Sequence, residues 1–564
     1  MPVEFLFTPP ILPLAMVSVR NKKNDKGRYL TRIFGIATHL FKKVYLSGDT
    51  DPARPGGNIN YTSTSKTMNK KVFHPLLFIP MLFWSGNDEN NKPADTKAKI
   101  DYGQPNIIMI VVDDLRWDEF SAAGHSFLST PNIDRLASEG VFFENAYHVV
   151  PLCSPNRASI LTGQYPSRHG IIDNVARDMA SHQLNLFPKE LQKAGYETAH
   201  IDKWHMGNDP TPRPGYDYWC SFPGQGRTID PQFYENDTLQ TVKGYVTDLL
   251  TDRAIGFINK KRGKPFFLFV GHKAIHPDAI QLNSGALDLQ AGSRYIPATR
   301  HEGKYRDAKF ERRKNSVLNF ELVDSQTVTG QTIYRKKSRE IETQFGAMLD
   351  HFTSDKTIRE RAEMLLAVDE GLGRILQKLE ELKILDNTFI LLTSDNGYFY
   401  GEHGLSLERR LPYEEAVRMP LLIRYPPLIK KNTRINEFVL SVDYAPTALE
   451  LGGAGSRSYI QGQSIIPLLQ GKKENRRKSF LMEYYSYENP MPWLIDTDYK
   501  ALRTERYKYI HWYKYENRNE LYDLIKDPFE MNNLVNEKNM QKVKKEMEEK
   551  LALEVVKVFE LGKN

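Results

Sequence analysis

Residues 107–114 read Ile-Ile-Met-Ile-Val-Val-Asp-Asp, a continuous apolar run that ends in two acidic residues. Such a run is typical of a strand buried on both faces, as in a parallel sheet covered by helices. Similar runs lie at residues 198–201, 266–270, 389–393 and 421–423. Helical stretches separate them, at residues 133–139, 187–194 and 359–382. The alternation predicts an α/β fold with a large, mostly parallel (mixed) sheet sandwiched by helices.

The chain changes in character from about residue 474. Short aromatic strands are expected at residues 479–485, 499–504 and 507–513, and residues 540–559 carry apolar side chains at helical spacing. We therefore expect residues 105–473 to form the large domain. Residues 474–564 are expected to form a smaller subdomain with an antiparallel sheet and a helix.

The N-terminal region contains an export signal in an unusual place. Residues 68–71 read Met-Asn-Lys-Lys, and an apolar run at 72–84 leads to Ser85-Gly86. This pattern predicts a secretory signal peptide over residues 68–86, too short for a stable membrane span. Residues 1–67 are then a non-native or disordered extension, and residues 87–104 a linker. We expect an exported protein, periplasmic or secreted.

Composition limits the possible partners. The chain has 564 residues, 40% of them hydrophobic, which is enough for a large core. Its net charge is +7, but residues 1–67 hold ten Lys/Arg against four Asp/Glu, so the remainder is close to neutral. A nucleic-acid partner requires a basic face on the folded part, and none is expected. The two cysteines are Cys153 and Cys220.

Polar residues follow four of the apolar runs. These are Asp113-Asp114, Asp202-Lys203-Trp204-His205, the pair His272 and His276, and Asp395-Asn396-Gly397. In open α/β sheets, ligands bind outside the carboxyl ends of the strands. Each group alone is also explained as a cap or a turn. All four at strand ends indicate a functional site at one sheet edge.

Residues 153–163 read Cys-Ser-Pro-Asn-Arg-Ala-Ser-Ile-Leu-Thr-Gly. Pro155 suits the first turn of a helix and Gly163 suits its end. Cys153 is therefore expected at a helix N-terminus, where free N–H groups favour an anion. Arg157, one turn later, is expected to reach back towards it. An ordinary helix start with a buried cysteine is the alternative.

The spacing of Cys153, Pro155 and Arg157 resembles the maturation signal of the type I (formylglycine-dependent) sulfatases, in the alkaline phosphatase superfamily. The resemblance extends from about residue 105 to the end and implies that residues 105–473 are the catalytic domain. It also implies that Cys153 is oxidised to formylglycine by a formylglycine-generating or an anaerobic sulfatase-maturating enzyme. The chain departs from the family pattern at Asn156, where Ser or Ala is usual.

Asp113, Asp114, Asp395 and Asn396 all offer oxygen donors, which suit Ca²⁺ or Mg²⁺. Three carboxylates close together repel one another unless a divalent cation neutralises them. The matching residues of sulfatases bind Ca²⁺. The resemblance therefore implies one Ca²⁺ per chain, held with an oxygen of the converted Cys153. Mg²⁺ is the second choice.

Further site residues come from the same resemblance. Lys203 and His205 match a Lys-x-His element, and His276 matches the histidine that contacts sulfate. Arg409 stands where the family usually has a lysine. His272 is a weaker candidate, either structural or substrate-facing. Among these, Lys203, His276, Arg409 and His272 are the expected substrate-binding residues.

The resemblance also implies a mechanism. One oxygen of the hydrated aldehyde, whose ionised form Arg157 favours, attacks sulfur. Lys203, His276 and Arg409 spread the charge on the sulfate oxygens. His276 gives a proton to the departing alcohol, and His205 takes one as sulfate is released.

The substrate class is less constrained. We expect a sulfated polysaccharide or its oligosaccharides, with a small aryl or choline-type sulfate second. Aromatic side chains that either stack on sugars or belong to the core are Tyr484, Tyr485, Tyr487, Trp493, Trp512 and Tyr513. A phosphonate monoester or phosphodiester hydrolase of the same superfamily is an alternative. An unmodified, inactive binding protein is another.

Overall fold

The computed structural model describes residues 103–560, apart from 281, 283–287, 289–292, 317–353, 404, 406–408, 456, 473, 475, 487–496 and 516–517. All of these residues belong to one compact unit. The predicted extension, the signal peptide and almost all of the linker lie outside the described residues. No described helix combines the length and the hydropathy needed to cross a membrane.

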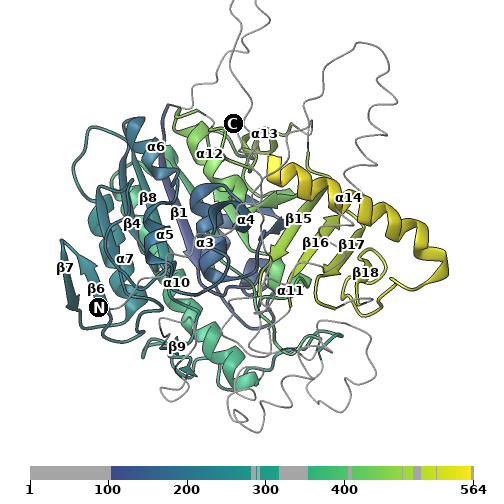
Figure 1. Cartoon of the computed structure of the whole chain (residues 1–564). Coiled ribbons are helices and arrows are strands. Elements are labelled where there is room, and N and C mark those ends of the chain that lie inside the picture. Colours follow the sequence, from purple (N-terminus) through teal and green to yellow (C-terminus); the bar gives the residue numbers. More distant parts are fainter. Residues whose placement is uncertain are drawn as a thin grey trace, which may run out of the picture. The chain divides into compact units, whose positions relative to one another are not determined.

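A ten-stranded mixed sheet forms the centre of the large domain (Figure 1). Its strands, in spatial order, are β13 (Thr433–Ile435), β2 (Val141–Phe143), β12 (Leu421–Arg424), β11 (Thr388–Ser394), β1 (Asn106–Val112), β8 (Phe266–His272), β4 (Glu197–Ile201), β5 (Tyr218–Ser221), β6 (Gln232–Glu235) and β7 (Thr238–Thr241). Strands β11, β1, β8, β4 and β5 are parallel, and β12 runs antiparallel to β11. Two small pairs lie outside this sheet, β9 (Asp278–Ala279) with β10 (Ser293–Arg294) and β3 (Ala146–Tyr147) with β14 (Val439–Leu440).

Helices cover both faces of this sheet. Alternate residues of β1 enter two separate cores, Ile108 and Ile110 on one face, Ile107 and Met109 on the other. The first face packs against α2 (Pro131–Glu139), α7 (Val246–Ile258) and α10 (Asp355–Glu381). The second packs against α3 (Cys153–Thr162), α6 (Pro188–Lys193) and α12 (Tyr444–Leu451). The predicted sandwich is confirmed. It forms because strands that are apolar along their whole length need helices over both faces of the sheet.

Shorter helices complete the large domain. They are η1 (Ser121–Ala123), α4 (Pro166–His169), α5 (Asp178–His182), η2 (Leu385–Asn387), α11 (Glu414–Val417), η3 (Ser441–Asp443) and α13 (Ile466–Leu469).

The C-terminal part forms a separate antiparallel sheet, β15 (Ser479–Tyr484), β16 (Tyr499–Thr504), β17 (Tyr507–Trp512) and β18 (Glu520–Asp523). Helix α14 (Gln541–Glu560), preceded by η5 (Lys538–Met540), buries an apolar stripe made of Met547, Leu551, Val555 and Val558. The sheet and helix are confirmed, although β18, with its two acidic ends, is an additional strand. The boundaries 105–473 and 474–564 stay predictions.

Two of the aromatic residues named from the sequence belong to the core of this sheet. Tyr484 and Trp512 are buried and pack against Tyr499, with ring centroids 5.8 and 5.5 Å from it. Tyr487 and Trp493 lie outside the described residues. The core explanation therefore holds for Tyr484 and Trp512.

Candidate active site

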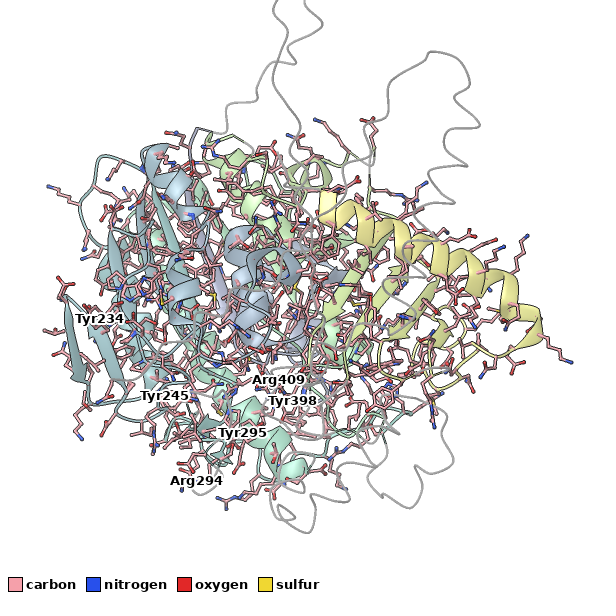
Figure 2. The ribbon with its side chains drawn as sticks, viewed as in Figure 1. Tyr234, Tyr245, Arg294, Tyr295, Tyr398 and Arg409 are labelled. Atoms are coloured by element: carbon pink, nitrogen blue, oxygen red, sulfur yellow. The ribbon has the colours of Figure 1, made fainter. Side chains whose placement is uncertain are left out.

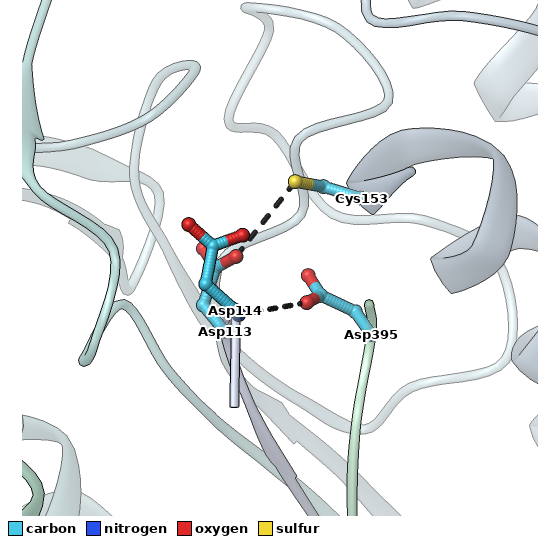
Figure 3. Close-up of side chains that lie close together, drawn as sticks. All are labelled: Asp113, Asp114, Cys153 and Asp395. Atoms are coloured by element: carbon cyan, nitrogen blue, oxygen red, sulfur yellow. Dashed lines mark hydrogen bonds between the residues drawn. The ribbon is translucent and has the colours of Figure 1, made fainter. Parts of the chain in front are cut away.

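Four buried side chains converge at the carboxyl edge of the central sheet (Figure 3). Asp113 and Asp114 follow β1, Asp395 follows β11, and Cys153 is the first residue of α3. Their candidate ligand atoms all lie within 4.8 Å of one another. The Cys153 thiol donates to Asp113 Oδ1 at 3.7 Å, and the Asp114 amide donates to Asp395 Oδ1 at 3.2 Å. Parallel strand order brings together residues that are far apart in sequence.

Helix α3 begins where the sequence predicts. Leu152 before it is extended, and Gly163 ends it at φ 68°, a left-handed conformation that glycine adopts without strain. The amide of Ser154 donates to Asn174 Oδ1 at 3.1 Å. Cys153 therefore sits at the positive end of the helix dipole.

Each of the three carboxylates has one cationic side chain beside it, but the three are also close enough to repel one another. Burial, reinforced by the charge of Asp113, raises the pKa of Asp395 to about 7. Burial also raises the pKa of Asp114. Burial alone would raise the pKa of Asp113, but Lys203, His276 and Arg157 hold it well below its usual range. A divalent cation would relieve this repulsion.

Two oxygen atoms support a cation at this place. Asp114 Oδ2 and Asn396 Oδ1 are buried, and neither has a hydrogen-bond partner within the described part of the chain. Asn396 Nδ2 donates to Asp114 Oδ1 at 2.6 Å, which ties the two side chains together. Buried polar atoms rarely lack partners, and oxygen-only donors fit a hard cation such as Ca²⁺ or Mg²⁺.

The thiol of Cys153 is a poor nucleophile in this setting. Burial, together with Asp113 and Asp395, raises its pKa to about 12. The thiolate is the reactive form of cysteine, so a neutral buried thiol is inert near neutral pH.

Arg157 joins the ends of two strands. Its Nε donates to Asp395 Oδ2 at 2.7 Å, and its Nη1 donates to Asp202 Oδ2 at 2.8 Å and to the Lys203 carbonyl at 2.7 Å. Arg157 thus clamps β4 to β11 beside the cluster that contains Cys153, and its approach to the cysteine itself stays a prediction. Asp202 is part of this clamp, although the sequence alone assigns it no role of its own.

Lys203 and His205 follow β4 as expected. Lys203 is buried, and its ammonium forms an ion pair with Asp113. His205 is 3% exposed and has φ 62°, and its carbonyl accepts a 2.6 Å hydrogen bond from Ser154 Oγ. Both residues therefore lie against the start of α3.

Arg409 contacts His276 and Asp114 at once. Its Nη2 lies 3.0 Å from His276 Nε2, and its Nε lies 3.1 Å from Asp114 Oδ1. Because arginine only donates, His276 Nε2 accepts, and Nδ1 donates to the Pro277 carbonyl at 2.8 Å. Burial, followed by the charge of Lys203, holds the pKa of His276 well below its usual range. His276 is thus neutral in this arrangement.

The guanidinium of Arg409 also lies over the ring of Tyr398, 5.8 Å from its centroid (Figure 2). The Tyr398 hydroxyl in turn accepts a 3.2 Å hydrogen bond from Tyr295. The side chain of Arg409 is 11% exposed, so it borders both the buried cluster and the solvent.

The sulfatase family model matches residues 105–454, and the model of the N-sulphoglucosamine sulphohydrolase C-terminal region matches residues 401–557. This chain belongs to the sulfatase family. The predicted sulfuric ester hydrolase with an alkaline-phosphatase-like fold is confirmed.

Two curated sulfatases and one solved structure illustrate the similarity. The N-acetylglucosamine-6-O-sulfatase of Bacteroides thetaiotaomicron is 33% identical over 79% of this chain and 85% of its own length. The ulvan-active sulfatase of Formosa agariphila is 26% identical over 90% of each chain. A solved structure in complex with its substrate D-glucosamine-2-N,6-O-disulfate matches with a TM-score of 0.67 and 32% identity. That match covers 81% of this chain and 98% of the other.

The main-chain carbonyl of His272 accepts a 3.3 Å hydrogen bond from the Asp113 amide of this sulfatase, but its side chain lies elsewhere. It is the last residue of β8, and strand alternation places it on the face of Leu268 and Val270, which pack in the core with α7 and α10. Burial lowers its pKa to about 4, opposed in part by Asp248 of α7. His272 was expected to be either structural or substrate-facing, and this placement favours the structural role.

Sequence reasoning missed Arg361, a fully buried residue of α10. Its Nη2 donates to the Asp114 carbonyl at 2.7 Å and to Glu119 Oε2 at 2.9 Å, and its Nε donates to the Tyr400 hydroxyl at 2.8 Å. Asp114 has φ 59°, and this hydrogen bond helps to hold its uncommon backbone conformation. The sequence offers only one sign of this role, which is that Arg361 is a charged residue within the apolar stripe of a predicted helix.

Proposed function

We propose that this chain desulfates a carbohydrate with a formylglycine nucleophile made from Cys153 beside a bound Ca²⁺. The convergence of Cys153 with Asp113, Asp114 and Asp395 in one buried group supports this proposal most directly. A formylglycine-generating or anaerobic sulfatase-maturating enzyme would supply the oxidant for the conversion. The converted residue would supply a hydroxyl of the aldehyde hydrate as nucleophile for sulfur, which the inert thiol cannot do.

Asp113, Asp114, Asp395 and Asn396 are the proposed ligands of the cation. Ca²⁺ would neutralise the carboxylates and polarise a sulfate oxygen. Mg²⁺ remains the second choice, because both are hard cations that prefer oxygen ligands. Arg157 is proposed to hold the Asp395 carboxylate in place through its 2.7 Å hydrogen bond.

Lys203, Arg409 and His276 are the proposed sulfate-binding residues. In this arrangement His276 Nε2 carries no proton, because it accepts from Arg409. We propose that the sulfate group enters between these two side chains, so that Arg409 donates to a sulfate oxygen. The anion would raise the pKa of His276, which then gains a proton and passes it to the departing alcohol. His205 is proposed to accept a proton as sulfate is released, and no direct role is proposed for His272.

The proposed substrate is a sulfated amino sugar carrying a 6-O-sulfate, at the end of or within a polysaccharide. The support comes from the N-acetylglucosamine-6-O-sulfatase at 33% identity and the complex with D-glucosamine-2-N,6-O-disulfate at 32% identity. The test measures sulfate released from N-acetylglucosamine-6-sulfate, glucosamine-2-N-sulfate and an aryl sulfate. We expect the 6-O-sulfate to be turned over fastest.

An aryl phosphodiester in the same panel tests the main alternative. The sulfatase proposal expects faster turnover of the aryl sulfate than of the matched phosphodiester. The reverse order would indicate a phosphodiester or phosphonate monoester hydrolase.

We also propose that the protein is exported through the signal peptide at residues 68–86. N-terminal sequencing of the protein from its natural source is expected to give a first residue after 86. Recovery of a peptide from residues 1–67 would contradict both this start and the proposed extension.

A further inference from the structure

Asn156 is the position at which the cysteine motif departs from the family pattern, and its side chain is fully used. One Nδ2–H donates to the Asp395 carbonyl at 2.7 Å, and the other points to His148 Nδ1 at 2.8 Å. Its Oδ1 accepts from Ser441 Oγ at 2.6 Å. Asn156, Ser441 and His148 are all buried. A hydroxyl has a single donor and cannot donate to both Asp395 and His148.

The contact with His148 requires a neutral imidazole. Since the amide nitrogen only donates, His148 Nδ1 must accept with its lone pair. Burial lowers the pKa of His148 to about 3, so it remains neutral over the physiological range. The amide of His148 donates to the Val417 carbonyl at 2.8 Å, which anchors it to the end of α11.

Two consecutive residues of α3 thus hold Asp395 at both ends. Asn156 binds its main-chain carbonyl, and Arg157 binds its carboxylate oxygen Oδ2 at 2.7 Å. The other carboxylate oxygen, Oδ1, is left facing the Asp114 amide. Asp395 lies directly after β11, so the direction of its carboxylate depends on how its main chain is fixed.

We propose that Asn156 is a positioning residue for the metal centre, which orients Asp395 through its carbonyl while Arg157 orients its carboxylate. The inference rests on the proposed function, since it assumes that Asp395 binds Ca²⁺. Asn156 touches neither substrate nor metal in this account. The replacement of the usual Ser or Ala by Asn156 then adds hydrogen bonds that hold Asp395, and it does not weaken the motif.

The test measures Ca²⁺ affinity by calorimetry on chelator-treated protein. Asn156→Asp keeps the shape but turns both donors into acceptors that oppose the Asp395 carbonyl and His148 Nδ1. Asn156→Ser introduces the common family residue, which replaces at most one donor. Loss of a partner that orients a metal ligand weakens metal affinity about 10- to 100-fold, and we expect this for Asn156→Asp with a smaller loss for Asn156→Ser. Asn145→Ser, the same change at a half-buried asparagine whose Nδ2 donates to the Asn436 carbonyl at 2.8 Å, is the matched control and should keep wild-type affinity.

Three further measurements distinguish loss of stability, loss of calcium binding and loss of cysteine conversion. The melting temperature of the calcium-free protein reports stability, whereas only the increment on adding Ca²⁺ reports positioning. The mass of the cysteine peptide reports whether the variants are still converted. If the wild type binds no Ca²⁺, the proposed function fails. If the wild type binds Ca²⁺ and Asn156→Ser binds it equally well, the inference is overturned, even if Asn156→Asp does not fold.

Discussion

Arg409 donates to His276 Nε2 at 3.0 Å while its Nε lies 3.1 Å from Asp114 Oδ1. One guanidinium therefore joins the proposed proton donor to a proposed metal ligand. The ammonium of a lysine is a single point charge and cannot present two donors in this fixed geometry. The arginine is thus suited to contact His276 and Asp114 together and, in the proposed mechanism, to donate to a sulfate oxygen.

Replacing Arg409 is expected to impair turnover. Arg409→Ala should lower kcat/KM about 100- to 1000-fold, because a preorganised donor to the reacting group is lost. Arg409→Lys keeps the positive charge and should lose less. Arg135→Ala is the control, since Arg135 is a partly exposed residue paired with Glu139 and Glu380. Near wild-type kinetics for Arg409→Ala would contradict the sulfate-binding role.

The role of His276 is tested by changing the leaving group. If His276 protonates the departing alcohol, His276→Ala should slow a sugar 6-sulfate about 100- to 10,000-fold. The same variant should lose much less on 4-nitrophenyl sulfate, whose leaving group departs without a proton. Equal losses on both substrates would show that His276 only binds sulfate. His182→Ala, which removes an exposed contact with Asp209, serves as the control.

Calcium binding is expected to release protons. Burial raises the pKa of Asp395 to about 7 and also raises that of Asp114 in the absence of metal. A ligating carboxylate must be deprotonated, so below pH 7 the cation has to displace a proton. The affinity for Ca²⁺ should therefore fall as pH falls from 7.5 to 5.5. Calorimetry in two buffers of different ionisation enthalpy measures the released protons, and an unchanged affinity would exclude these carboxylates as ligands.

The loop after Arg409 is held by a buried lysine of the C-terminal sheet. Lys508 Nζ lies 2.8 Å from Glu414 and 2.7 Å from Glu530, and it donates to the Pro412 carbonyl at 3.0 Å. Lys508→Met should destabilise the fold by about 3–5 kcal/mol, because buried Glu530 loses its cationic partner and buried Glu414 loses one of several. Lys557→Met, at an exposed pair with Glu554, should change the melting temperature little.

This destabilisation should grow with pH. The pKa of Glu530 is raised to about 7, chiefly by burial and despite Lys508. An unfolded glutamate titrates near 4.3, so the folded state retains a proton that the unfolded state has lost, and stability falls as pH rises towards 7. Without Lys508 the pKa rises further, so the deficit of Lys508→Met should be larger at pH 8 than at pH 6. Melting curves at both values check this, and an equal deficit would contradict it.

The sequence predicts those parts of the site that follow from strand order. Asp113, Lys203 and Asp395 each lie just beyond the end of a predicted strand, and parallel pairing brings such ends to one edge. The start of α3 at Cys153 is equally readable, because Pro155 and Gly163 bound the helix.

The remaining contacts depend on tertiary packing, which the periodic pattern of apolar residues in the sequence does not predict. Arg361 looks like any charged residue of a long helix until its neighbours are known. Arg157 pairs with the two carboxylates Asp202 and Asp395, and the spacing of the cysteine motif does not predict these pairs. In the sequence, Asn156 is only a departure from the family pattern. Its partners His148, Asp395 and Ser441 lie outside the cysteine motif, and no sequence spacing predicts these contacts.

The peptide that spans residues 136–157 gives the most direct test of the account. Its mass should be measured in protein from a host with a maturating enzyme, alongside sulfate release from N-acetylglucosamine-6-sulfate. The account predicts that the thiol of Cys153 is replaced by an aldehyde and that activity scales with the converted fraction. An intact thiol in fully active protein would contradict it.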